Sequence, residues 1–520
     1  MRSRSLGVAI LQALSFGLVV APAVARAEVK LPPAISSHMV LQREMPVPIW
    51  GTAAPGEKVT VAFQGQEKST TADKDGKWLV KLDPLKVSGP DKLTVAGTNT
   101  LTLDDVLVGE VWVGSGQSNM AGGVAGYTKN DEVLAEMAEG TYPRLRLLKS
   151  RSAGWQEATP ANIKGFSALL FSFGLPLHKD IDVPLGLMVG AVGGTPSGYW
   201  LSEDAYNADA ACKEVVERFA ATHPFEDMEK RYKEDLAKWE KDEAEAKQAG
   251  KKAPRQPPPP QKPGDCRGKL GNLYEAHIRP FIPYAIRGVL WDQGESGTAI
   301  HGIDQCTLMG ALIRGWRKEW GQGDFPFLYI QKPSGGGCAW DPADPVTAKA
   351  DKFAPLPAAV PNTNDGLYVE NHVRIMQHPN TAMVTSTDLG AGIHPVNKSG
   401  YGARAARVAL GMVYGRKVEV YGPVYQAYKV EADKVRITFT HVGQGLAFRH
   451  ADAVKGFALA GEDKVFHWAD AVIGGDAAVV SSGKVPNPVA VRYGWGRTHP
   501  WANLFNKDGL PALPFRTDAW

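Results

Sequence analysis

The sequence lacks a large excess of charge of either sign and, after its N-terminus, any long apolar run. Its 520 residues include 58 basic and 55 acidic side chains, a formal net charge of +3. No basic block is large enough to indicate a nucleic-acid-binding surface, and no later stretch is apolar enough to span a bilayer. With 44% hydrophobic residues, the chain can bury a large core. We expect a globular protein of two or three domains that binds no nucleic acid and has no stable membrane insertion.

Cysteine is scarce, and clusters of metal ligands are missing. The four cysteines allow three pairings into two disulfides, and we favour Cys212 with Cys266 because they bracket a segment that looks inserted. Three histidines, His301, His372 and His378, have no close Cys, Asp or Glu companions at metal-ligand spacing. We therefore predict neither a metal site nor another cofactor.

The N-terminus has the pattern of an export signal. Arg2 and Arg4 precede an apolar run over residues 6–20, and Ala25-Arg26-Ala27 offers a small-x-small cleavage site. We predict a signal peptide over residues 1–27 and a mature protein that is periplasmic or secreted. An uncleaved membrane anchor is the alternative, and the shortness of the apolar core disfavours it.

The pattern of hydrophobic residues changes twice along the chain. Short alternating runs such as Val59–Phe63 fill residues 28–105, and similar runs return over 416–520, so a β-sandwich-like domain is predicted at each end. Residues 106–415 alternate apolar strands with longer segments that can form helices. This pattern predicts an α/β domain with a mainly parallel sheet, whose active site lies beyond the carboxyl ends of the strands.

Residues 212–266 look like an insertion in this α/β domain. Met228, Tyr232, Leu236 and Trp239 fall on one face of a charged helix, and four consecutive prolines, 257–260, follow it. Proline cannot continue a helix and favours an extended chain. We interpret the segment as a solvated helical insertion with a stiff return; a docking arm is the alternative.

One strand ends in an unusual way. The run GEVWVGSGQSNM (109–120) is apolar and β-prone until it breaks into glycines and delivers Ser118. A serine just beyond a strand, at the start of a helix, can act as a nucleophile, and its own N–H can help to stabilise an oxyanion. An ordinary helix N-cap is the alternative. Ser115 is a second candidate by the same reasoning.

Three further strand ends carry polar or glycine-rich segments. One leads into Gly193-Gly194, whose bare N–H groups suit an oxyanion, and another into Gln293, whose amide is a further donor. A third leads into a loop with an acid, Asp388, and a histidine, His394. All four segments would meet at one edge of a parallel sheet.

These motifs occur together in a known family. The runs GEVWVGSGQSNM, GLMVGAVGGTPSGYW, GVLWDQGES and IHPVNKSGYGARAARVAL resemble those of sialate O-acetylesterase-type carbohydrate esterases of the SGNH hydrolase superfamily. The resemblance extends over nearly the whole mature chain except the insertion and a loop at about 334–365. It implies an SGNH-type three-layer α/β core.

The resemblance also implies roles for individual residues. Ser118 matches the nucleophile of the family's GQSN motif, and His394 matches the histidine of its IHP motif. The oxyanion donors would be the N–H groups of Ser118 and Gly194 and, as a further candidate, the side chain of Gln293. His394 would take the proton of Ser118 and later protonate the departing sugar hydroxyl.

The sequence departs from the family at two positions. Many relatives carry an aspartate two residues before the histidine, where this chain has Gly392. Asp388 is then our candidate for the triad acid; alternatively, a backbone carbonyl orients His394. The run Ala121-Gly122-Gly123 follows Met120 where relatives often carry larger residues, and we expect it to widen or loosen the wall beside the nucleophile.

Trp200 and Glu295 lie in the same motifs as the candidate site residues. Trp200 follows the glycine loop and is either part of a sugar platform or a packing residue. Glu295 is expected to anchor other side chains rather than to act as an acid.

The sequence therefore predicts a carboxylic ester hydrolase that removes O-acetyl groups from a sugar or glycan, with sialic acids as the first candidate. A deacetylase for xylan or pectin is the alternative within enzymology. A carbohydrate-binding protein with weakened catalysis is the alternative outside it. Substrate choice depends on loops that carry no readable code.

Overall fold

The computed structural model describes residues 28–332, 334–361, 364–390 and 392–520. The predicted signal peptide, 1–27, lies outside the described residues. Within those ranges, no helix combines the length and the apolar character needed to cross a bilayer.

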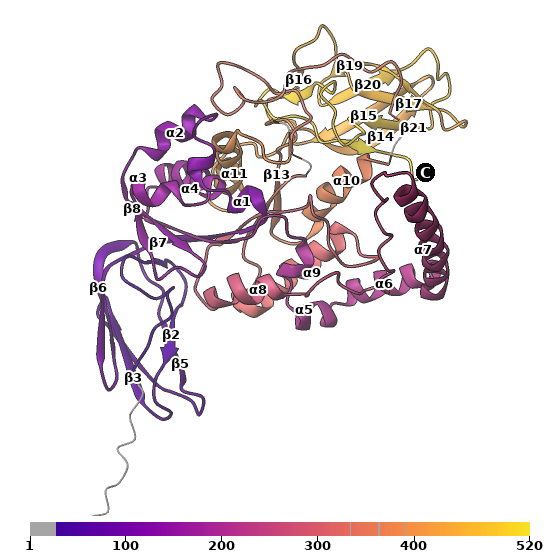
Figure 1. Ribbon diagram of the computed structural model, residues 1–520. Helices are drawn as coiled ribbons and strands as arrows, with labels where there is room; N and C mark the ends of the chain where they lie inside the picture. Colours follow the sequence, from indigo (N-terminus) through magenta and orange to yellow (C-terminus); the bar gives the residue numbers. More distant parts are fainter. Residues whose placement is uncertain (1–27, 333, 362–363, 391) are drawn as a thin grey trace, which may run out of the picture.

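A twisted sheet forms the centre of the molecule (Figure 1). Its strands follow the order β13-β12-β11-β7-β10-β8-β9, and every neighbouring pair is parallel except the last, β8 with β9. This confirms the predicted mainly parallel sheet. The strands are β7 (Thr100–Gly116), β8 (Tyr142–Lys149), β9 (Gln156–Ala158), β10 (Leu185–Ala191), β11 (Gly288–Asp292), β12 (Phe327–Ile330) and β13 (Thr381–Val384).

Helices cover both faces of this sheet. Side chains alternate between the faces along a strand, and β7 places Trp112 on one face, where its ring lies 5.1 Å from Phe173 of α4 (Ala168–Ile181). On the other face, the ring centroid of Trp291 in β11 lies 5.8 Å from that of Trp316 in α9 (Gln305–Trp320). Two helix layers therefore enclose the sheet.

The remaining helices connect the strands. They are α1 (Ser118–Ala121), α2 (Glu132–Ala138), α3 (Pro160–Lys164), α5 (Glu203–Ala208), α6 (Ala210–Thr222), α7 (Phe225–Gln248), α8 (Asn272–His277), α10 (Gly366–Arg374) and α11 (Lys398–Met412), with the 3₁₀ turns η1 (Val124–Gly126), η2 (Ser197–Trp200), η3 (Arg279–Phe281) and η4 (Ile375–Gln377).

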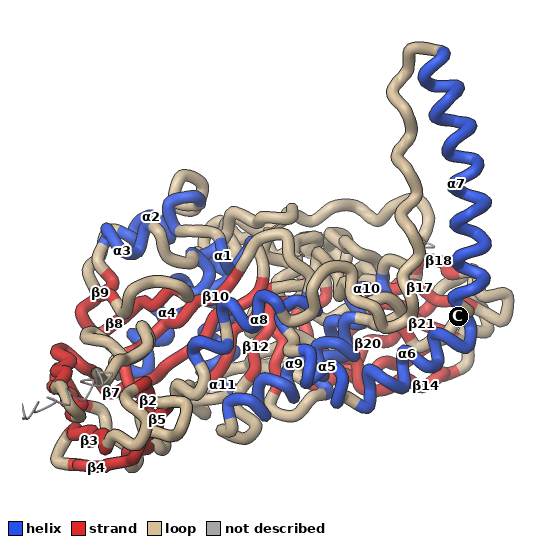
Figure 2. Tube along the Cα trace, turned by 60° about the horizontal axis from the view of Figure 1, so that its bottom comes forward, coloured by secondary structure: helices blue, strands red, loops and turns tan. Residues whose placement is uncertain are grey.

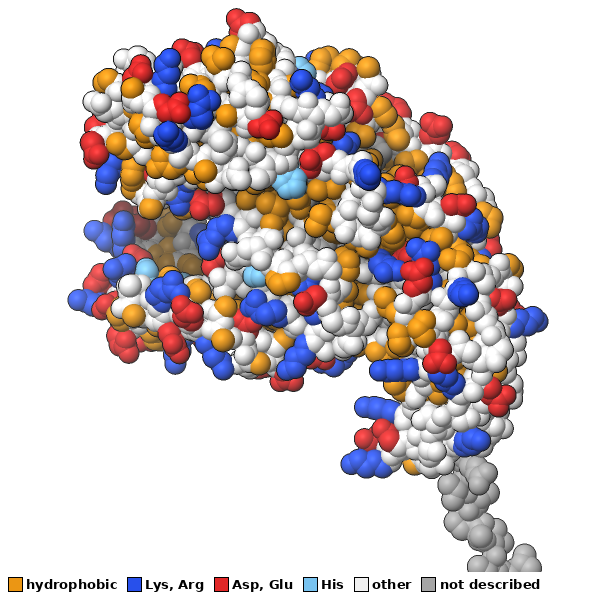
Figure 3. All heavy atoms as spheres, turned by 180° about the vertical axis from the view of Figure 1, so that it is seen from behind, with side chains coloured by type: hydrophobic (Ala, Val, Ile, Leu, Met, Phe, Trp, Pro, Cys, Tyr) orange, Lys and Arg blue, Asp and Glu red, His pale blue; other side chains and the backbone are white. Residues whose placement is uncertain are grey.

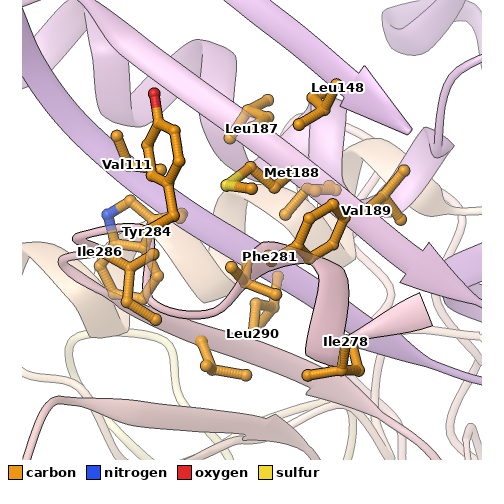
Figure 4. Close-up of a cluster of buried hydrophobic side chains, with 14 of the residues drawn as sticks. Val111, Leu148, Leu187, Met188, Val189, Ile278, Phe281, Tyr284, Ile286 and Leu290 are labelled. Carbon is orange, nitrogen blue, oxygen red and sulfur yellow. The ribbon is translucent and has the colours of Figure 1, made fainter. Parts of the chain in front are cut away.

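The core between the sheet and the chain that follows α8 is closely packed (Figure 4). Met188 of β10 lies on the side of the sheet that carries Phe281 and Tyr284, and all three side chains are buried. Burying side chains of this size contributes roughly 1.5–3 kcal/mol each. This packing fixes the strands whose ends carry the candidate site.

The N-terminal strands are continuous with the central sheet. The strand β7 is 17 residues long, and its first half pairs with β6 while its second half lies between β10 and β11. The domain boundary predicted at residue 105 thus falls inside one strand. The N-terminal strands are β1 (Val40–Gln42), β2 (Val47–Thr52), β3 (Lys58–Phe63), β4 (Gln66–Thr71), β5 (Lys77–Leu82) and β6 (Ser88–Ala96).

The C-terminal part consists of antiparallel sheets over a core of their own. One sheet has the order β14-β15-β20-β19, a second has β18-β17-β21-β23, and β16 pairs with β22. The strands are β14 (Val424–Glu431), β15 (Lys434–Thr440), β16 (Leu446–Phe448), β17 (Phe457–Ala460), β18 (Phe466–Trp468), β19 (Asp470–Gly474), β20 (Ala477–Ser481), β21 (Ala490–Tyr493), β22 (Leu504–Asn506) and β23 (Phe515–Arg516).

The predicted insertion projects from the body as the helix α7, followed by an extended segment without regular secondary structure that returns to the body (Figure 2). Met228, Tyr232, Leu236 and Trp239 of α7 are half-buried although the rest of the helix is mostly exposed. Trp239 Nε1 donates to the carbonyl of Pro254 at 2.9 Å. The apolar face of α7 is therefore covered by its own proline-rich return.

The predicted Cys212–Cys266 bridge is wrong: all four cysteines have free thiols. Cys212 is buried in α6, whereas Cys266 is half-buried and forms an isolated β-bridge with Ile300. A disulfide requires a specific distance and orientation of the two Cβ atoms. Bracketing a segment in sequence does not supply that geometry.

Acidic and basic side chains are interspersed over the face shown in Figure 3. This mixture agrees with the near balance of charges in the sequence.

Candidate active site

The ends of β7, β10 and β11 bring three of the predicted segments to one edge of the sheet. Gly116 at the end of β7 is the register partner of both Ala191 in β10 and Asp292 in β11. The segments with Ser118, the Gly193-Gly194 pair and Gln293 begin just beyond these positions. The parallel arrangement therefore gathers them as expected.

A glycine makes the turn that carries Ser118. Gly116 has a φ of +131°, and a Cβ there would lie 2.0 Å from the carbonyl oxygen of Asp292. Only glycine fits this close approach. The N–H of Gln117 donates to the same carbonyl at 2.8 Å, and α1 starts at Ser118.

Ser118 and His394 line one cavity of about 510 Å³. Ser118 is half-buried and His394 is exposed. The wall consists of Ser118, Gly122, Gly123, Gly126, Tyr127, His394 and Val396. Ser115, the other candidate, is fully buried in β7 and is not part of this wall.

Glycine keeps this cavity open on the side of Tyr127. A Cβ at Gly122 would lie 2.8 Å from the hydroxyl oxygen of Tyr127, whereas a Cβ at Gly126 would meet nothing within 4 Å. The tyrosine ring and the lack of a side chain at residue 122 thus define the width of the site together.

The glycine loop 193–194 lies near the Ser118 side chain. A Cβ at Gly193 would lie 3.4 Å from the Cβ of Ser118, so the glycine loop passes directly beside the serine. Within the described residues, the N–H groups of Ser118 and Gly194 donate to no other group. Their roles as oxyanion donors stay predictions.

Gln293 has a different role from the one predicted. Its Nε2 donates to the carbonyls of Thr195 at 3.2 Å and Gly297 at 3.1 Å, and its Oε1 accepts from Gln305 at 3.1 Å. A buried amide needs such partners, and these contacts use both of its N–H bonds. Gln293 therefore supports the glycine loop from behind and does not serve as an oxyanion donor in this structure.

Asp388 is buried beside Arg404. The guanidinium of Arg404 donates to its two carboxylate oxygens at 3.4 and 3.2 Å. No hydrogen bond joins Asp388 to His394 in the part of the chain that the structure describes. The role of Asp388 as triad acid stays a prediction, and its partner here is an arginine.

A buried charge network lies behind Ser118. Lys332 Nζ lies 2.6 Å from Asp292 Oδ1 and 2.8 Å from Glu295 Oε1. Glu295 in turn accepts from Gln117 Nε2 at 2.6 Å and Asn119 Nδ2 at 3.3 Å. The two neighbours of the serine are thus anchored to one carboxylate, as expected for Glu295.

Burial and the neighbouring charges set the pKa values in this network. Burial raises the pKa of Asp292, and Lys332 opposes that shift. Burial alone would lower the pKa of Lys332, but Asp292 and Glu295 outweigh it and raise this pKa. His372 is neutral because burial, together with Lys332, lowers its pKa to about 3. Roles for Lys332 and Asp292 were not predicted from the sequence. Asp292 is the last residue of β11, and Lys332 follows the end of β12 by two residues.

Tryptophan residues near the site are packing residues. Trp200 is fully buried, and its Nε1 donates to Thr195 Oγ1 at 3.1 Å. Trp112 and Trp291 are buried as well. Trp200 therefore holds the glycine loop from below and offers no platform to a sugar.

No family model matches the chain, but known proteins similar to it were found. The human sialate O-acetylesterase is 27% identical over 79% of this chain and 76% of its own length. The rat sialate O-acetylesterase is 30% identical over 58% of this chain and 59% of its own. The solved structure of the carbohydrate acetylesterase XAC1771 from Xanthomonas citri superposes with a TM-score of 0.73 at 29% identity, covering 95% of this chain and all of that chain, 100%.

The fold and these relatives define the chain as a carboxylic ester hydrolase. More narrowly, it is a homologue of the sialate O-acetylesterases, which confirms the resemblance found in the sequence.

Proposed function

We propose that this protein is a serine esterase that hydrolyses O-acetyl esters on a carbohydrate, with Ser118 as nucleophile and His394 as general base. The observation that carries the proposal is the cavity that Ser118 and His394 share at the carboxyl end of the parallel sheet. The names of the relatives support the acetyl ester and the carbohydrate.

The proposed reaction has two halves. His394 takes the proton of Ser118 as Oγ attacks the acetyl carbonyl, and the N–H groups of Ser118 and Gly194 stabilise the oxyanion. The bond to the sugar oxygen then breaks, and His394 gives its proton to that oxygen, leaving an acetyl-enzyme. Water attacks this ester with His394 again as base, and acetate leaves as Ser118 regains its proton.

Three finer predictions belong to the same proposal. The helix-covered parallel sheet supports an SGNH-type core. The N-terminal sequence pattern supports a signal peptide and export to the periplasm or the medium. The changes of β and α/β character along the chain support domains at 28–105, 106–415 and 416–520, although the first boundary interrupts β7.

Two substrate classes remain within this function. The relatives named sialate O-acetylesterase support an acetylated sialic acid. The cavity supports a neutral acetylated polysaccharide such as xylan, because its described lining contains no lysine or arginine to pair with a sialic acid carboxylate.

Acetate release separates these classes. The enzyme is incubated with O-acetylated sialic acid and with acetylated xylan at equal acetyl concentration, with Ser118→Ala as the control. A larger kcat/KM on sialic acid supports the first class, and a larger value on xylan supports the second. Release from neither by folded protein would contradict the proposal.

A further inference from the structure

Lys398 is a buried cation close to the candidate site. It is the first residue of α11 and is only 1% exposed. Its Nζ donates to Asn119 Oδ1 at 2.7 Å, its one hydrogen-bond partner among the described residues. The ammonium also lies 4.7 Å from the ring centroid of Tyr127, which lines the cavity, and 5.7 Å from that of Tyr401.

Keeping an ammonium in this place is costly for folding. A buried charge needs close and complete partners to offset the loss of hydration, and Lys398 has one neutral oxygen and two aromatic faces. Burial lowers its pKa to about 7; Asp292, Glu295 and Asp131 oppose that shift, and Lys332 adds to it. A side chain of similar length without a charge would avoid this cost, so the position indicates a role beyond packing.

The contact with Lys398 determines which way the amide of Asn119 points. Lys398 Nζ donates to the amide oxygen of Asn119, and a lysine amine keeps N–H donors whether or not it is protonated, so this contact turns the oxygen of Asn119 toward Lys398 and its nitrogen away. That nitrogen donates to Glu295 Oε1 at 3.3 Å and to the carbonyl of Ile393 at 3.0 Å. Ile393 is followed directly by His394, whose loop is otherwise exposed at Gly392, Ile393 and His394.

We propose that Lys398 is a positioning residue, which fixes the amide of Asn119 so that Asn119 holds the Ile393 carbonyl and keeps His394 beside Ser118. The inference rests on the proposed function of Ser118 and His394. Lys398 itself does not line the cavity, so it acts through Asn119 and not on the substrate.

A double-mutant cycle tests the route through Asn119. We measure the rate at which an organophosphonate ester labels Ser118, and kcat and KM for acetate release, in wild type, Lys398→Met, Asn119→Leu and the double variant. Lys398→Met is expected to lower the labelling rate and kcat at least tenfold, with KM changed less than threefold. The double variant is expected to match Asn119→Leu within twofold, because both changes remove one pathway. Multiplied effects in the double variant would overturn the proposal.

Hydrogen exchange provides a readout that does not depend on catalysis. Peptides that cover residues 392–397 should exchange at least fivefold faster in Lys398→Met than in wild type. The control is Lys349→Met, which removes an exposed lysine paired with Glu132 and should leave both exchange and labelling unchanged. Unchanged exchange in Lys398→Met would overturn the proposal.

The two measurements separate the two hypotheses. If wild type is not labelled at Ser118, the proposed function fails, and hydrogen exchange alone decides whether Lys398 orders the loop.

If Lys398→Met does not unfold cooperatively, the same cycle and exchange are measured with Lys398→Gln. The glutamine has no charge but keeps an N–H donor, and intermediate labelling and exchange are expected. A wild-type labelling rate together with wild-type hydrogen exchange in Lys398→Gln would contradict the proposed role of Lys398.

Discussion

Asn119 joins the loop of the candidate nucleophile to the loop of the candidate base: its Nδ2 donates to the carbonyl of Ile393 at 3.0 Å. The two loops are 274 residues apart in the chain. A side chain adjacent to Ser118 thereby fixes the backbone adjacent to His394. The geometry of the pair depends on this contact and on the buried charges beneath it.

The pairing of Asp388 with Arg404 leads to a prediction about stability. Asp388→Asn leaves a buried guanidinium without its carboxylate, and breaking such a pair costs about 3–5 kcal/mol. We expect a loss of about 3 kcal/mol in the free energy of unfolding, measured with urea. The triad role predicted for Asp388 adds a drop in kcat of at least about a hundredfold, with a smaller change in KM.

The matched variant for that prediction is Arg404→Met, which breaks the same ion pair from the other side. It should be destabilised similarly and should keep its kcat. A kcat of folded Asp388→Asn within tenfold of wild type, or an equal drop in kcat in Arg404→Met, would contradict the triad role.

The width of the cavity depends on Gly122. In Gly122→Ala the new methyl group meets the Tyr127 hydroxyl at 2.8 Å, so the ring has to move into the cavity or away from it. We expect KM for an acetylated sugar to change by about three- to tenfold, measured by steady-state acetate release. Gly126→Ala adds a methyl group in open space on the same wall, and an equal effect there would rule out the Tyr127 contact as the cause.

The burial of Lys398 gives the stability a specific pH dependence. Its pKa is about 7 in the folded protein and about 10.4 in an unfolded chain. The unfolded state therefore binds more protons between pH 7 and 10, and the contribution of Lys398 becomes more favourable as pH rises. The free energy of unfolding of wild type minus that of Lys398→Met should rise by up to about 1.4 kcal/mol per pH unit. Urea unfolding at pH 7, 8 and 9 measures it, and a constant difference would contradict the lowered pKa.

The thiols should differ in reactivity. Burial raises the pKa of Cys212 and Cys338 to about 12, so few of these thiols are ionised at pH 8. Cys266 is half-buried and should react first with a thiol reagent in native protein. Unfolded, unreduced protein should show four reactive thiols. Peptide mapping that recovers Cys212 joined to Cys266 would contradict the free thiols.

The sequence predicts much of the site because its signals are local. An apolar strand that ends in Gly116, a glycine pair at 193–194 and a histidine after a fourth strand each have a readable pattern. Parallel pairing then brings the first two of these segments, and the segment with Gln293, to one edge, and the structure agrees.

The parts that were missed depend on contacts between distant segments. Gln293 looked like a free donor because nothing in its own segment shows that Thr195 and Gly297 take its hydrogens. Lys332 and Lys398 were not singled out, since the sequence does not show that they are buried with Asp292 and Asn119. The predicted boundary at residue 105 falls inside β7, because the β pattern of one region continues within that strand.

The most direct test of the central claim is the site of labelling by an organophosphonate ester, read by mass spectrometry of intact and digested enzyme. Only a serine activated by a base should react stoichiometrically. We predict one equivalent on Ser118, no labelling and no acetate release in folded Ser118→Ala, and normal labelling in Ser115→Ala. A label on Ser115, or acetate release by Ser118→Ala at the wild-type rate, would contradict the account.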